Sequence, residues 1–119
     1  MFINFTNHPS SNWDEKQLLQ ARKYGEIKDL VFPQVDPSSS NQEIYLQAKE
    51  YVEQIVSFHP QAVLVQGEMT LTYNVVKGLK EKKILVLCAC SSRVAFEEHL
   101  ADGQTVKKSI FKFIQFREY

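Results

Sequence analysis

Two continuous apolar runs separated by a helix-like segment are the features that most constrain the fold of this chain. The runs cover residues 62–65 and 84–90. Strands that are apolar on both faces are typical of parallel sheets, which helices cover from both sides. Between the runs, apolar residues recur at helical spacing, at Leu71, Val75, Val76 and Leu79. The segment therefore predicts a β–α–β unit with a right-handed crossover, and with it a parallel sheet.

The N-terminal half repeats this alternation of strands and helices. The predicted elements there, strands and helices in turn, are residues 2–6, 13–24, 28–32 and 40–58. Ser40 and Glu43 match a capping box at the start of the longer helix, and Gly25 is placed to end the shorter one. The prediction is a single domain over residues 1–119, a small Rossmann-like three-layer α/β sandwich with about four parallel strands.

The C-terminal part of the chain is less regular. Residues 94–109 fit two short strands around an Asp-Gly turn, with a short helix at residues 93–99 as the alternative. Residues 110–116 predict a last strand, which extends the sheet antiparallel. Its three aromatic residues exceed what an edge strand should expose, so either the helices of the monomer or a second copy in a homodimer covers them. They are Phe111, Phe113 and Phe116.

Composition excludes some classes of function. Fourteen basic and fourteen acidic side chains give no formal net charge, so a large surface for long nucleic acids is not expected. No apolar run approaches the roughly 18 residues of a membrane helix, and the N-terminus does not resemble a signal peptide. We therefore expect no membrane partner and a cytoplasmic location.

Cys88 and Cys90 lie two residues apart in an apolar run. In a strand they share one face, which suits either a metal or redox pair or two small buried hydrophobes. A four-ligand zinc site usually has a second pair, and this chain has no other cysteine. Small hydrophobes are therefore the favoured interpretation, and no metal or cofactor is expected.

Three predicted strand ends should lie at one edge of the sheet, because the carboxyl ends of parallel strands share that edge. Their hydroxyls, amides and backbone N–H groups suit phosphates, and Gly67 would let the backbone approach a ligand closely. The predicted ligand-binding residues are Thr6, Asn7, Ser10, Ser11, Gln66, Gly67, Thr70, Ser91 and Ser92.

Three charged or titratable side chains in these segments are candidates for catalysis. His8 suits proton transfer near neutral pH, although a loop histidine can also simply pack or cap. Glu68 is either a catalytic carboxylate or a carboxylate stabilised at a helix N-terminus. Arg93 is either a phosphate ligand or one half of a surface salt bridge.

Two of these segments resemble a known group of proteins. The sequence FTNHPS at residues 5–10 is similar to the first strand and loop of small stand-alone CRISPR-associated proteins. Those proteins have a Rossmann-like fold akin to the CARF domains that sense cyclic oligoadenylate. Residues 66–70 occupy the place of the glycine- and threonine-containing loop in CARF-type domains. Glu68 and Met69 stand where some of those loops have a lysine, in the form Gly-Gly-Thr-Lys.

The resemblance implies a ring nuclease, which degrades cyclic oligoadenylate and switches off the type III CRISPR antiviral response. Such enzymes are dimers, with cyclic tetra-adenylate as the typical ligand lying across the two-fold axis. Their reaction needs no metal, because the ribose 2′-hydroxyl attacks the adjacent phosphate and leaves a 2′,3′-cyclic phosphate. The alternatives are a nucleotide-binding sensor module without chemistry, and a phosphate-handling enzyme of another family on the same fold.

Overall fold

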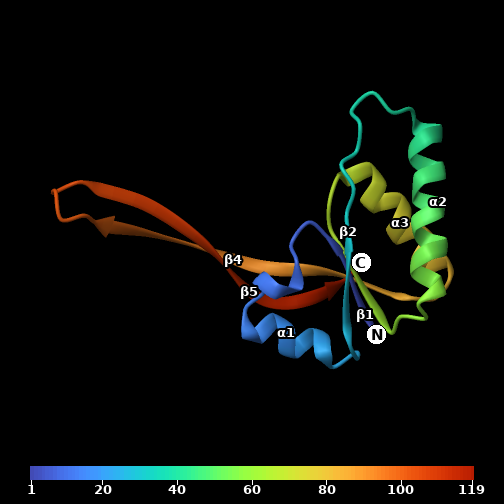
Figure 1. The fold of residues 1–119 in the computed structure, drawn as a ribbon, viewed down its shortest axis with the longest axis horizontal. Helices are drawn as coiled ribbons and strands as arrows, with labels where there is room; N and C mark the ends of the chain where they lie inside the picture. The colour runs from blue at the N-terminus through green and yellow to red at the C-terminus, as the bar shows by residue number, and fades with distance from the viewer.

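The computed structural model describes all residues from 1 to 119, in which five strands form one sheet with the order β2-β1-β3-β4-β5 (Figure 1). The first four strands run parallel and the last is antiparallel to β4, which confirms the predicted mainly parallel α/β sheet. The strands are β1 (Phe2–Thr6), β2 (Ile27–Val31), β3 (Ala62–Val65), β4 (Leu85–His99) and β5 (Thr105–Glu118). The helices are α1 (Glu15–Arg22), α2 (Asn41–Ser57) and α3 (Met69–Glu81), preceded by a 3-10 turn, η1 (Ser10–Asn12).

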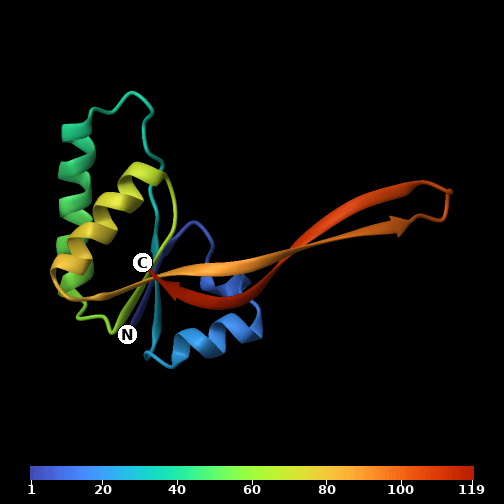
Figure 2. The same ribbon diagram turned by 180° about the vertical axis from the view of Figure 1, so that it is seen from behind.

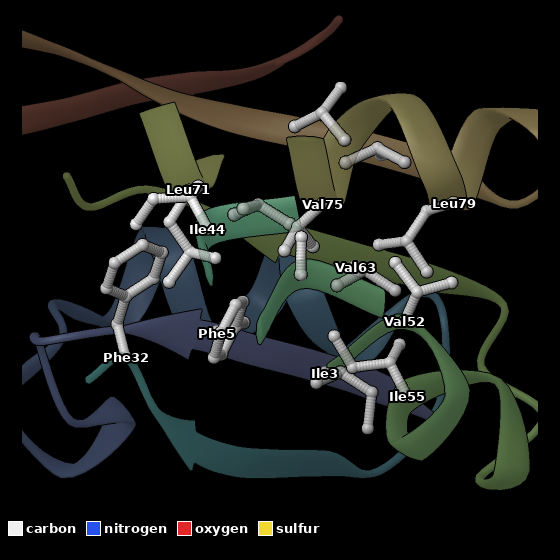
Figure 3. Packing of buried hydrophobic residues seen from close by; sticks show 14 residues of the cluster. Ile3, Phe5, Phe32, Ile44, Val52, Ile55, Val63, Leu71, Val75 and Leu79 are labelled. Carbon is white, nitrogen blue, oxygen red and sulfur yellow. The ribbon is translucent and has the colours of Figure 1, made fainter. Parts of the chain in front are cut away.

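Helices lie on both faces of the sheet. On one face, α2 and α3 bury a cluster that includes Ile3, Phe5 and Val63 (Figure 3). On the other face, α1 covers a smaller cluster around Phe2 and Leu64. Alternate residues of one strand point to opposite faces, so β1 supplies both clusters. No helix is long and apolar enough to cross a membrane.

Helix boundaries follow local capping chemistry. The predicted capping box is present, because the Ser40 hydroxyl accepts from the Glu43 N–H at 3.1 Å and the Ser40 N–H donates to the Glu43 carboxylate at 3.2 Å. Helix α1 begins two residues later than predicted, since Asp14 caps it by accepting from the Gln17 N–H at 2.8 Å. As predicted, Gly25 lies just beyond this helix, at a φ of 111°.

Strands β4 and β5 continue past the sheet as a two-stranded arm (Figures 1 and 2). The arm gives the molecule extents of 55 × 38 × 20 Å and a radius of gyration of 17.1 Å. A compact chain of this length has a radius of gyration of about 13.5 Å. The short helix considered for residues 93–99 is therefore wrong. The hairpin alternative is right, with Gly103 in its turn at a φ of 86°. Its strands are not separate short elements, however, because the first is the continuation of β4 and the second forms one strand, β5, with residues 110–116.

A bulge at the base of the arm decides which aromatic side chains are covered. Cys90 pairs with Gln115 but Ser91 pairs with Phe113, so β5 carries one extra residue there. The extra residue places Phe113 and Phe116 on the same face, with ring centroids 4.9 Å apart. That face packs beside α1 and Trp13, so the monomer covers both rings. Phe111 stays 74% exposed.

The turn between β3 and α3 is built around a close contact. A Cβ on Gly67 would lie 2.4 Å from the Phe32 ring. That ring is 2% exposed and packs on Phe5 with centroids 4.8 Å apart, so it has no room to move away. Core packing thus accounts for a glycine at this position.

Helix α3 begins at a glutamate cap. The Glu68 carboxylate accepts from the backbone N–H groups of Thr70 and Leu71 at 2.8 and 2.9 Å, and from the Thr70 hydroxyl at 2.7 Å. Bonds from the Thr70 N–H, the Leu71 N–H and the Thr70 hydroxyl, in that order of importance, hold the pKa of Glu68 below its usual range. Hydrogen bonds to a carboxylate favour its ionised form.

Substituting Gly67→Ala should lower the free energy of unfolding by about 1–3 kcal/mol, the usual cost of overpacking a well-filled core. Urea denaturation followed by circular dichroism measures it. In a Phe32→Leu background the second substitution should cost clearly less, because the contacting ring is gone. Equal cost in both backgrounds would contradict the proposed clash.

Substituting Glu68→Ala should cost on the order of 1 kcal/mol at pH 7 through loss of the helix cap. A lowered folded-state pKa means that the stabilisation is complete above the ordinary glutamate pKa and disappears as the pH falls through the lowered value. The difference in the free energy of unfolding between the wild type and Glu68→Ala should therefore become smaller at acidic pH. Glu81→Ala, at the other end of α3, is the control and should be neutral or slightly stabilising. A pH-independent loss in Glu68→Ala would refute this account.

Candidate functional site

A cavity of about 630 Å³ opens at the carboxyl ends of β1 and β3 and beside the middle of β4, on the side of the sheet that α1 covers. It brings together four of the predicted site residues: Thr6, His8, Gln66 and Ser91. Ser91 was predicted to follow the end of a strand, but it lies within β4, which continues to His99. Three aromatic side chains that the sequence did not assign to the site, Trp13, Phe111 and Phe113, also line it. The predicted convergence of strand ends is thus present for part of the set.

Other predicted residues line different cavities. Gly67 lies in a cavity of about 350 Å³ on the α3 side, together with Tyr73 and Tyr119, and Gln66 reaches both this cavity and the larger one. Ser10 and Ser11 line a third cavity of about 600 Å³ beside the end of α1. The three strand-end segments therefore do not form one pocket.

A buried polar network supports the loop that carries His8. Asn4 and Thr6 are 1% and 6% exposed, and the Thr6 hydroxyl donates to Asn4 Oδ1 at 2.8 Å. The Asn4 amide donates to the His8 carbonyl and to the Asp29 carboxylate, both at 2.9 Å. The same carboxylate accepts from the backbone N–H and the hydroxyl of Ser10. The sequence signal for this network was a polar residue, Asn4, within an otherwise apolar stretch of β1.

Gln66 holds the ends of two strands together. Its side-chain carbonyl accepts from the Ala89 N–H at 2.9 Å, which continues the pairing of β3 with β4 beyond the last ladder residues. The Tyr119 hydroxyl donates to the Val65 carbonyl at 2.7 Å on the other side of this strand end. The floor between the two cavities is therefore fixed by side-chain hydrogen bonds.

Glu68 and Thr70 lie outside the large cavity, and their polar groups bond to each other in the cap of α3. The helix-terminus interpretation of Glu68 is thus what the structure shows. Its carboxylate occupies the N–H groups that an anion would need at this helix terminus. Its lowered pKa also disfavours the protonated form that a general acid requires.

Arg93 and Ser91 lie on the face of the arm that continues the cavity wall. Arg93 pairs with Phe111 and Ser91 with Phe113 across the hairpin, and paired residues of an antiparallel ladder share a face. Arg93 makes no ion pair, since the one in the structure joins Lys108 and Glu98. Ser92 points to the opposite face, and Asn7 is exposed beside the cavity without lining it.

The two cysteines lie on the face of β4 turned away from the large cavity. Both are free and half-buried. Burial, and next the neighbouring Cys90, raise the pKa of the Cys88 thiol. A raised pKa leaves little thiolate, the form that attacks substrates and binds metals.

The arrangement can hold a flat ring and an anionic group at the same time. Trp13 and Phe111 offer aromatic surface, Gln66 and Ser91 offer hydrogen bonds, and the exposed His8 imidazole can take or give a proton. Arg93 pairs with Phe111, which lies on the same face as the Ser91–Phe113 pair, and it supplies a positive charge near the rim of the cavity. These groups together suit a nucleotide.

Comparison with known proteins places this chain in a family. No match is found among the curated proteins. One protein-family model, described as "Uncharacterized protein MJ1673 family", matches residues 1–117. Because the match spans nearly the whole sequence, the chain belongs to the MJ1673 family.

Proposed function

We propose that this protein is a metal-independent ring nuclease that cleaves cyclic oligoadenylate, with cyclic tetra-adenylate as the expected substrate. The observation that carries the proposal is the cavity at the strand ends, where His8, Gln66 and Ser91 meet aromatic surface. The resemblance of residues 5–10 to CRISPR-associated CARF-like proteins supplies the ligand class. The cellular role that follows is to switch off type III CRISPR signalling in the cytoplasm.

The chemistry needs positioning and charge stabilisation more than a strong nucleophile. The His8 imidazole takes the proton of a ribose 2′-hydroxyl, whose oxygen then bonds to the adjacent phosphorus. The bond from phosphorus to the 5′-oxygen breaks, and that oxygen receives a proton from solvent water, to which the His8 imidazolium returns the proton it took. The products are a 2′,3′-cyclic phosphate and a 5′-hydroxyl. Arg93 and the Gln66 amide are placed to stabilise the charge on the phosphoryl oxygens.

Cavity size limits how much of the ring one protomer engages. Its volume of about 630 Å³ lies within the roughly 300–1,000 Å³ of typical small-ligand pockets. A ring of four nucleotides is larger than this, so one protomer encloses one part of the ring, including a single scissile linkage. A base stacks on Trp13 or Phe111 while the linkage lies beside His8.

A sensor without chemistry is the second candidate, and the cap of α3 favours it. Two groups were candidates for proton transfer, and the Glu68 carboxylate is engaged by three hydrogen bonds in the cap. The His8 imidazole is then the one remaining candidate for proton transfer, and an imidazole at this position can equally bind a nucleotide without chemistry. Under this alternative the same cavity binds the cyclic nucleotide without turnover and stabilises the fold.

Incubation with cyclic tetra-adenylate in EDTA should give linear products with 2′,3′-cyclic phosphate ends, separated by chromatography. His8→Ala should lower kcat by about 10²–10⁴-fold, the usual contribution of a general base. Arg93→Ala should lower kcat by about 10²-fold. The matched control is Arg117→Ala, an exposed arginine outside the cavity, and it should behave as wild type.

The outcome of the same experiment separates the candidates. Ligand-induced thermal stabilisation without any product establishes the sensor instead of the nuclease. Neither product nor stabilisation, with cyclic tetra-adenylate and cyclic hexa-adenylate alike, eliminates both.

We further propose that the protein is a homodimer joined through the arm. An isolated two-stranded ribbon is marginally stable in water, yet this arm extends beyond the body with one apolar face. That face carries a stripe of exposed apolar side chains, at Val94, Phe96 and Ile110, with Lys108 and Lys112 beside them. The opposite face holds mainly polar and charged groups next to Phe111.

Charges at the two ends of the stripe favour a second copy as the partner. Lys112 lies at its base and Glu98 near its tip, on the same face. Two arms stacked antiparallel about a two-fold axis would place each Lys112 near Glu98 of the partner subunit, in addition to the ion pair that Glu98 forms with Lys108 of its own arm, so the surface is self-complementary. The stripe faces away from the cavity, so this dimer keeps the two cavities separate and open. Each would then bind a ring by itself, unlike the shared two-fold site that the resemblance implies.

Light scattering coupled to size exclusion should show a dimer for the wild type. Ile110→Glu places a charge in the stripe and should give monomers, whereas Ser109→Glu, its neighbour on the opposite face, should stay dimeric. Lys112→Glu should weaken the dimer, because it places a second carboxylate near Glu98 of the partner subunit. A monomeric wild type, or a dimeric Ile110→Glu, would sink the arrangement.

A further inference from the structure

We infer that Thr6, Asn4 and Asp29 are positioning residues that fix the backbone of His8 at the mouth of the cavity. The inference deepens the proposed function, because it assigns these three residues a role that they exert through the backbone of His8. The peptide groups of His8 are held by several side chains, while its imidazole makes no hydrogen bond and lies exposed at the cavity.

Both polar groups of the His8 backbone are held by side chains instead of by regular secondary structure. Its N–H donates to the Thr6 hydroxyl at 3.0 Å. Its carbonyl accepts from the Asn4 amide at 2.9 Å and from the Trp13 indole N–H at 3.2 Å, while the single proton of the Thr6 hydroxyl is donated to Asn4 Oδ1. A carbonyl has two lone pairs, so these two donors satisfy it. The position of this peptide is therefore strongly determined.

Asn4 is an unexpected residue for its place in the fold. It lies at the middle of the interior strand β1, 1% exposed, on the same face as Phe2. An apolar side chain there would fill the space without needing partners, whereas a buried amide is tolerated only when its hydrogen bonds are made. Both amide protons of Asn4 and its oxygen are used, one proton on His8. The amide therefore ties the strand to the loop.

Asp29 anchors the far end of the same loop. It is the ladder partner of Asn4 on the edge strand β2. One carboxylate oxygen accepts from the Asn4 amide at 2.9 Å, and the carboxylate also accepts from the Ser10 N–H at 3.2 Å and the Ser10 hydroxyl at 3.1 Å. The loop is thus fixed before His8 by Thr6 and after it by Ser10. A general base needs this combination of a fixed backbone and a ring that is free for the substrate.

The test uses the near-isosteric change Thr6→Val, which removes the hydroxyl, and Thr6→Ser, which keeps it. Amide hydrogen exchange measured by NMR should be at least about tenfold faster at His8 in Thr6→Val and near wild type in Thr6→Ser. Misplacement by about 1 Å can cost 10²-fold in rate, so kcat for cyclic tetra-adenylate should fall by about 10- to 100-fold in Thr6→Val. KM should change less than about threefold.

A double-mutant cycle identifies His8 as the residue through which Thr6 acts. In a His8→Ala background, Thr6→Val should cause no further loss of kcat, because interacting residues are non-additive. Thr105→Val is the matched control, since this threonine also bonds to a histidine, His99, but at the tip of the arm. It should leave kcat and the His8 exchange rate unchanged. If Thr6→Val unfolds the protein, the exposed Asp29→Asn tests the same network, because an amide nitrogen cannot accept from the Ser10 N–H.

The two measurements keep this inference separate from the proposed activity. If the wild type does not cleave the ring, the activity is wrong, and faster exchange in Thr6→Val with recovery in Thr6→Ser still supports the positioning. Unchanged exchange at His8 in both Thr6→Val and Asp29→Asn overturns the inference. Equal loss of kcat from Thr6→Val with and without His8 overturns it as well.

Discussion

The rest of the structure depends on the burial of the interior strand β1. Every residue of this strand is buried, between β2 and β3 in the plane of the sheet and between helices above and below. Burying a side chain as large as Phe2 or Phe5 contributes about 1.5–3 kcal/mol, and these two rings lie on opposite faces. The strand is thus rigid, and a loop that leaves its end starts from a fixed point. The candidate site is built at that point.

The turn between β3 and α3 has the residue types of a ligand-binding loop, but in this structure those residues stabilise the core and the helix terminus. Gly67 avoids the Phe32 ring, and Glu68 occupies the N–H groups at the helix N-terminus. An anion arriving there would meet a carboxylate that is already hydrogen-bonded and negatively charged. The better candidate site for an anion is therefore the cavity on the other side of Gln66, towards α1. Asp14, the cap of α1, is the one negatively charged side chain that lines this cavity.

Local patterns predicted the elements well, because strands, helices and the capping box of α2 depend on residues close in sequence. What escaped prediction depends on register. The contact of Asn4 with Asp29 exists only because β1 and β2 pair in one register. The shared face of Phe113 and Phe116 requires a bulge that their odd spacing does not reveal. The division of the predicted site among three cavities also could not be predicted from the order of the strands. That order places the loops at one edge of the sheet, but it does not say on which face of the sheet each loop lies.

In the proposed dimer the arm would connect assembly to the candidate site, because both use the same pair of strands. Alternate residues of β4 point to opposite faces. Ser91 and Arg93 therefore lie on the face of the cavity, whereas Val94 and Phe96 lie on the opposite face and belong to the apolar stripe. A partner packed on the stripe would restrain a ribbon that is otherwise supported only at its base. The cavity wall formed by Ser91 and Phe111 lies at that base. Dimerisation through the arm would thereby stiffen one wall of each cavity without covering it.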